Sequence, residues 1–178
     1  MIILYNQRKI TFIGGVKMKH SLTLSFIFLV SISLTANASE EKIRVELANK
    51  TISFYKCLSQ RQYKQMENML DEQFEMNGQV HFGNKDETIN FFKSTYGKRP
   101  KKIDVKKVIV LNYHDLKLLK KSVGIKLSLR LLNKVERNDW VTVIKKLSVN
   151  GASIKKSTSL IFRQREQKWL IRGIYLQD

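Results

Sequence analysis

The sequence predicts an α+β protein in which three N-terminal helices pack on a mainly antiparallel sheet. Two observations support this prediction. Through most of residues 40–96 apolar side chains recur every three or four positions, which is the spacing of amphipathic helices. From residue 103 onward they alternate with polar side chains, which is the spacing of strands. One apolar face per strand indicates a sheet covered on one side, and the upstream helices are available to cover it.

Two helices are expected in residues 40–71. Residues 40–60 place apolar side chains at helical spacing and predict an amphipathic helix with one wide apolar face. The same spacing returns from Tyr63, which predicts a second, shorter helix ending near Asp71. Cys57 falls on the first helix and is the single cysteine of the chain, so no internal disulfide is possible and packing alone must hold the fold.

A short strand and a third helix are expected before the main sheet begins. Residues 73–82 alternate apolar and polar side chains, with a turn or bulge expected at Gly78. Residues 86–96 predict a helix that begins at an Asn84 or Asp86 cap, because acids follow in its first turn and a glycine follows its end.

The rest of the chain is expected to form long antiparallel strands. The alternation is cleanest in residues 123–131, which we assign to a strand. Asn150-Gly151 lies between two alternating runs and predicts a hairpin. The predicted strands span residues 103–113, 123–131, 140–149, 154–164 and 168–177.

Residues 1–38 are typical of an export signal. Lys17 and Lys19 precede an apolar run over residues 22–34, and Ala36-Asn37-Ala38 supplies the small residues that a signal peptidase accepts. Cleavage before Ser39 is therefore expected. The alternative is a membrane anchor, but the run is shorter than the roughly 20 residues of a spanning helix and contains several serines and threonines.

The export signal sets the expected domain boundary and location. Because Met18 can open the signal by itself, residues 1–17 are either an artefact of an upstream start codon or an extended basic segment. Residues 39–178 have the length of one domain. We expect this domain to be periplasmic or secreted and to have no stable membrane span.

The charge of the chain is strongly positive. The formal net charge is +18, and the four basic residues before residue 38 leave without any acid, so the exported part keeps +14. Such a charge attracts anionic surfaces, although scattered lysines on solvent faces are the alternative explanation. Export makes nucleic acid a poor candidate partner. The compact basic cluster that we assign to an anionic envelope partner is Lys98, Arg99, Lys101 and Lys102.

Several short segments carry a resemblance to a known family. They are Phe54-Tyr55-Lys56-Cys57-Leu58, Met69-Leu70-Asp71-Glu72-Gln73-Phe74, Gly83 with Ile89-Asn90-Phe91-Phe92, and Gln167-Lys168-Trp169-Leu170-Ile171 followed by Tyr175. With this order of elements, the chain resembles the nuclear transport factor 2-like superfamily, also called cystatin-like or SnoaL-like. The resemblance implies a cone-shaped fold: three N-terminal helices on a strongly curved, mainly antiparallel sheet that encloses a pocket. It supports the fold much better than a function.

Enzymes of this superfamily place ionisable groups in the pocket, and this chain offers few. The catalytic candidates are Tyr55, Glu75 and His81, of which Glu75 is the sole carboxylate of its strand. This shortage of carboxylates argues against acid–base chemistry. No glycine-rich phosphate loop or nucleophile elbow occurs, and the histidines and cysteine form no recognisable metal-ligand set, so no cofactor or metal is expected.

Aromatic and apolar residues suggest a ligand pocket and a dimer. Residues that could line an apolar pocket are Tyr55, His81, Tyr113 and Trp140, and Trp169 and Tyr175 are further aromatic candidates. Val141, Val143 and Leu147 are opposite in parity to Trp140, Thr142 and Ile144, so this strand is apolar on both faces, as in a sheet covered by a partner. The resemblance also implies a homodimer, because members of the superfamily frequently pair through that side of the sheet.

These observations together predict an exported, non-catalytic binding or interaction domain. Its partner would be a small apolar ligand in the cone pocket or an anionic component at the basic surface. The alternatives are a SnoaL-like isomerase or hydrolase with an atypical pocket that uses Tyr55, Glu75 and His81, and a subunit of an envelope or secretion complex.

Overall fold

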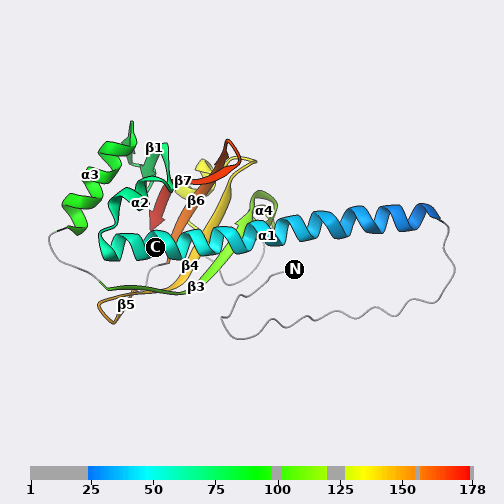
Figure 1. Cartoon of the computed structure of the whole chain (residues 1–178), viewed down its shortest axis with the longest axis horizontal. Coiled ribbons are helices and arrows are strands. Elements are labelled where there is room, and N and C mark those ends of the chain that lie inside the picture. The colour runs from blue at the N-terminus through cyan, green and yellow to red at the C-terminus, as the bar shows by residue number, and fades with distance from the viewer. Residues whose placement is uncertain (1–23, 98–101, 120–126, 155–156, 177–178) are drawn as a thin grey trace.

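The computed structural model describes residues 24–97, 102–119, 127–154 and 157–176, and these form helices packed on a curved sheet (Figure 1). The α+β class is confirmed. The helices are α1 (Leu24–Gln60), α2 (Tyr63–Glu67), α3 (Lys85–Tyr96), α4 (Tyr113–Leu119) and α5 (Leu129–Lys134). The strands are β1 (Leu70–Met76), β2 (Val80–Phe82), β3 (Ile103–Asn112), β4 (Trp140–Val149), β5 (Ala152–Ile154), β6 (Thr158–Arg165) and β7 (Lys168–Leu176).

The strands join in the order β2-β1-β7-β6-β4-β3, and β5 pairs with β4. Only β1 and β7 run parallel among the described pairs; the others are antiparallel. The register shifts between Ile161 and Phe162 on β6 and between Val105 and Val108 on β3. Such irregularities bend strands, and the sheet curves behind α1 (Figure 1).

The first face of the sheet is covered by α1, α2 and α3. Phe54 of α1 meets Phe92 of α3 edge to face at 5.8 Å between ring centroids, and Phe92 meets Phe74 of β1 at 5.9 Å. These three rings are at most 1% exposed, so each contributes about 2 kcal/mol through burial. Thr51 on α1 hydrogen-bonds to Thr142 on β4 at 2.9 Å, which satisfies two buried hydroxyls at the helix–sheet contact.

The second face is covered by helices that the sequence did not predict. Leu116 of α4 and Leu131 of α5 pack there with Val141, Val143 and Ile161. The chain itself therefore covers the apolar second face at the start of β4. A partner chain is not needed to explain why this face is apolar. The parity assigned to Leu147 was wrong, because the shifted register between β3 and β4 returns it to the first face.

The strand predicted over residues 123–131 is wrong where the structure describes it. Residues 123–126 lie outside the described ranges, and Leu129–Lys134 is helical. The Ser128 hydroxyl accepts from the backbone N–H of Leu131 at 3.2 Å, which is an N-cap that starts the helix.

The strand predicted over residues 103–113 ends at Asn112, and the chain continues directly into the first turn of α4. The side chain of Asn112 accepts from Asp115 N at 2.8 Å, and the Asp115 carboxylate accepts from Asn112 N at 3.0 Å. This reciprocal capping box fixes the chain direction at the end of β3 and starts a helix there.

Several boundaries also differ from those predicted. α1 begins at Leu24 rather than near residue 40, α2 ends at Glu67, and the predicted strand 154–164 is divided between β5 and β6. The Asn84 cap of α3 is observed, with its side chain accepting from Glu87 N at 2.9 Å. Among the described helices, none combines the length and apolar character needed to cross a bilayer.

Candidate functional site

The β1–β2 hairpin places an acid and a histidine opposite each other. Asn77 and Gly78 both take positive φ, so the chain turns at the glycine, and Glu75 pairs with His81 across the two strands. The Nδ1 atom of His81 lies 3.5 Å from Oε2 of Glu75. The sequence placed both residues on one strand, whereas the turn brings them together as cross-strand neighbours.

Glu75 is buried and surrounded by groups that compensate its charge. Its side chain is 10% exposed, and the hydroxyl of Tyr175 donates a hydrogen bond to Oε1. Lys134 Nζ lies 3.6 Å from Oε2, and Arg172 Nη2 lies 3.9 Å from Oε1. Burial, followed by the hydrogen bond to Glu75, raises the pKa of Tyr175 well above its ordinary value.

Gly173 allows β7 to approach β1 at this point. A Cβ on residue 173 would lie 3.1 Å from Cγ of Glu75 and 3.2 Å from Cε2 of Tyr175. These distances are shorter than ordinary van der Waals contact, so the glycine leaves the space that the acid and the phenol occupy.

Two arginines beside Glu75 are held by acids from the turn before β4. Arg163 bonds to Asp139 through Nε at 2.9 Å and Nη2 at 3.2 Å, and Asp139 has no exposed side-chain surface. Arg172 donates to Glu136 at 3.0 Å and to the Lys134 carbonyl at 2.8 Å. Hydrogen bonds from both arginines lower the pKa of Glu136. The guanidinium groups are thereby fixed in position.

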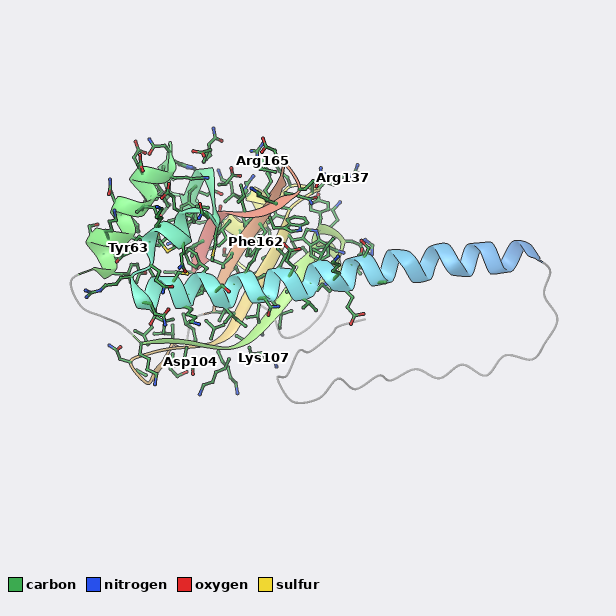
Figure 2. The ribbon with its side chains drawn as sticks, viewed as in Figure 1. Tyr63, Asp104, Lys107, Arg137, Phe162 and Arg165 are labelled. Atoms are coloured by element: carbon green, nitrogen blue, oxygen red, sulfur yellow. The ribbon has the colours of Figure 1, made fainter. Side chains whose placement is uncertain are left out.

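A pocket of about 300 Å³ lies between the β1–β2 hairpin and the ends of β6 and β7. Phe162 lies in the interior of the molecule, whereas Arg165, three residues later on β6, lies at its upper edge in the view of Figure 2. Arg165 is 54% exposed and its Nε is 3.6 Å from Asp71. The titratable residues of the pocket wall are Asp71, Glu75, His81, Arg163, Arg165 and Arg172.

The residues predicted for an apolar ligand do not lie together. Tyr55 and Trp140 are 6% and 8% exposed in the core between the helices and the sheet, and burial raises the pKa of Tyr55. Tyr113 begins α4 and packs against the second face, with Lys117 over its ring at 4.6 Å. His81 alone of the four borders the pocket.

The remaining predicted residues are the catalytic candidates and the basic cluster, and the structure describes only some of them. Glu75 and His81 come together, but Tyr55 packs with Phe74, whose side chain alternates with that of Glu75 across the sheet. Lys98, Arg99 and Lys101 lie outside the described ranges, and the fourth residue of that cluster, Lys102, is exposed beside the β4–β5 hairpin.

Sequence reasoning missed Arg163 and Arg172, and it considered Tyr175 as a pocket-lining aromatic residue but not as a partner of Glu75. A basic residue within an otherwise apolar strand was the available signal: Arg163 follows Leu-Ile-Phe, and Arg172 follows Trp-Leu-Ile. The search for acids and histidines passed over them. Within the described ranges, no three His, Cys, Asp or Glu side chains are grouped as a metal site.

The comparisons with known proteins give structural likenesses and no sequence match. No family model and no curated protein matches the sequence. Among solved structures, the chain is similar to a nuclear transport factor 2-like protein of unknown function from Cytophaga hutchinsonii, with 15% identity, coverage of 72% of this chain and 86% of that one, and a TM-score of 0.39. It is also similar to one from Shewanella oneidensis, with 12% identity, coverage of 74% and 98%, and a TM-score of 0.40.

A designed protein with a curved β-sheet is similar to the same extent. It has 13% identity to this chain, with coverage of 74% of this chain and 99% of the designed one, and a TM-score of 0.40. Nuclear transport factor 2-like proteins are therefore among the structures similar to this chain, and the likeness concerns the fold.

Proposed function

We propose that this protein is an exported, non-catalytic binding domain that holds a small organic or inorganic anion in the pocket between the β1–β2 hairpin and β6–β7. The observation that carries the proposal is that three guanidinium groups, those of Arg163, Arg165 and Arg172, line one pocket. Guanidinium groups bind carboxylates and phosphates through paired hydrogen bonds. A polar ligand fits these walls better than the apolar ligand expected from the sequence.

The three arginines have different roles in the proposal. Acids hold Arg163 and Arg172 as fixed parts of the wall. Arg165 forms one ion pair within the described ranges, at 3.6 Å, and more than half of its side chain is exposed. It is the arginine with donors available to a ligand, and the net charge of +14 on the exported part favours the approach of anions.

Calorimetric titration of the protein with inorganic phosphate and with succinate tests the proposal. Replacing Arg165 by Gln should weaken binding by about tenfold, the loss expected for one charge-assisted contact. Arg137→Gln removes the same charge from an exposed residue outside the pocket, and its affinity should stay within about twofold. Equal losses in both variants, or no binding by the unaltered protein, would contradict the proposal.

A second candidate function is acid–base catalysis, which the contact between His81 and Glu75 favours. A histidine oriented by a carboxylate can accept a proton, and the side chain of His81 is 60% exposed at the pocket wall. A compound that copurifies with the protein should then be converted by the unaltered protein and not by His81→Gln. Anion binding without conversion by either protein would favour the binding domain.

A further inference from the structure

The chain between β3 and β4 carries apolar side chains on two opposite surfaces. Leu116 of α4 and Leu131 of α5 are 3% and 0% exposed because they pack on the second face of the sheet. Leu118 and Leu129, two residues away on the same helices, are 56% and 73% exposed. Two positions along a helix turn by about 200°, so each helix presents one leucine to the sheet and another to solvent.

The exposed charges next to these leucines are basic. Lys117 and Arg130 adjoin Leu118 and Leu129 in the sequence, and both are exposed. Neither forms an ion pair within the described ranges. Lys117 contacts only the ring of Tyr113, at 4.6 Å, among its described ion-pair and ring contacts.

The two acidic residues within residues 113–137 already form ion pairs with arginines. Asp115 pairs with Arg44 of α1 at 2.9 Å, and Glu136 pairs with Arg163 at 2.6 Å. These acids therefore do not neutralise the lysine and arginine beside the exposed leucines. Because both helices pack on the second face of the sheet, their outer sides point away from that face and carry leucine and uncompensated positive charge. We call these outer sides together the α4–α5 surface and define it as Lys117, Leu118, Leu129 and Arg130.

We propose that the α4–α5 surface docks the protein on a bilayer that contains anionic phospholipids. Leucine side chains enter the boundary between headgroups and acyl chains, while Lys and Arg remain at the phosphate level. Anionic headgroups supply the complementary charge. Nucleic acid would match the two cations but would leave the exposed leucines without an apolar partner. This site is separate from the arginine-lined pocket.

Cosedimentation with vesicles tests the docking surface. Vesicles of phosphatidylcholine with about one third phosphatidylglycerol should bind the protein at about 0.15 M salt, and vesicles of phosphatidylcholine alone should bind much less. Leu118→Ser with Leu129→Ser should lower the partition coefficient by about tenfold. The matched control is Val45→Ser with Leu176→Ser, which changes residues 40% and 50% exposed elsewhere and should leave partitioning within about twofold.

The charge of the surface is tested separately. Lys117→Gln with Arg130→Gln should lower partitioning more than Lys56→Gln with Lys168→Gln, which removes the same charge elsewhere. Circular dichroism and urea unfolding establish that each variant is folded. Equal effects of test and control pairs, or absence of binding by the unaltered protein, would overturn the proposal. Binding to polyglutamate but not to vesicles would assign the surface to an acidic protein and would equally overturn it.

Discussion

Glu75 shows how one buried acid organises its neighbours. Taking a carboxylate out of water is costly unless partners compensate the charge. Here the hydroxyl of Tyr175 hydrogen-bonds to it, and Lys134, His81 and Arg172 lie within 4 Å. The carboxylate therefore contacts four side chains from three elements, β2, α5 and β7, and the loss of one partner changes the environment of the others.

Removing the Tyr175 hydroxyl should destabilise the protein. Tyr175→Phe deletes a hydrogen bond to a buried carboxylate, so the free energy of unfolding should fall by about 2 kcal/mol in urea titrations at neutral pH. Tyr113→Phe is the matched control, because its ring packs at a partly exposed position and the change should cost less than about 0.5 kcal/mol. Equal costs would mean that the hydrogen bond adds no stability.

For Tyr175→Phe we also expect a change in the pH dependence of the unfolding free energy. The pKa of Tyr175 is raised in the folded protein by burial and by its bond to Glu75, while an unfolded tyrosine titrates near pH 10. A raised folded pKa gives stability that is present below about pH 10 and lost as the pH rises above it. The difference in unfolding free energy between the unaltered protein and Tyr175→Phe should therefore shrink at about pH 11. Other buried tyrosines are common to both proteins and cancel.

The candidate site was predicted only in part, for reasons visible in single residues. Glu75 could be singled out because it is the only acid of the strand predicted over residues 73–82, and His81 because the whole chain has three histidines. The observed β1 begins at Leu70, however, and also carries Asp71 and Glu72. The contact between Glu75 and His81 depends on where the chain turns, and the glycine signal allowed either a turn or a bulge. Tyr175 is 100 residues away from Glu75, and that pairing follows from the parallel contact of β1 with β7, which residue spacing does not reveal.

At the scale of elements, long strands were predicted better than short helices. Residues 140–149 are rich in β-branched side chains and end at the Asn150-Gly151 turn, so the predicted bounds of β4 match those observed. Leu127, Leu129 and Leu131 alternate with polar residues, yet α5 buries Leu131 and exposes Leu129. The local cap at Ser128 and the packing of Leu131 determine the structure there, and a period of two over so few residues does not distinguish the alternatives.

The cap at Ser128 can be tested by substitution. Ser128→Ala should lower the free energy of unfolding by about 1 kcal/mol, as Asn84→Ala should at the start of α3, because each change leaves a helix N–H without its partner. Ser94→Ala is the matched control within α3, where alanine is the better helix former, and it should be neutral or slightly stabilising. A Ser128→Ala variant as stable as Ser94→Ala would contradict the helical assignment.

At the scale of the whole molecule, one experiment can measure both the N-terminus of the processed chain and its oligomeric state. Native mass spectrometry of protein purified from an exporting cell should give an N-terminus at Ser39, because the small residues before it match a signal peptidase site. Twice that mass would indicate the homodimer expected from the sequence, which would have to form through another surface, because α4 and α5 cover the second face of the sheet. Protein that retains residues 1–38 would contradict export, and a processed monomer would contradict the dimer.

α1 continues without a break through the expected cleavage point before Ser39, so a processed chain would begin within this helix. Cutting before Ser39 would create a new helix start, with a positively charged ammonium group at the positive end of the helix dipole. Glu40 and Glu41 fall in that first turn and would offset both charges. Arg44, one turn on, bonds to the Val110 carbonyl at 2.6 Å and to Asp115 at 2.9 Å. The shortened helix would thus start with favourable charges and be tied to the sheet within its first two turns.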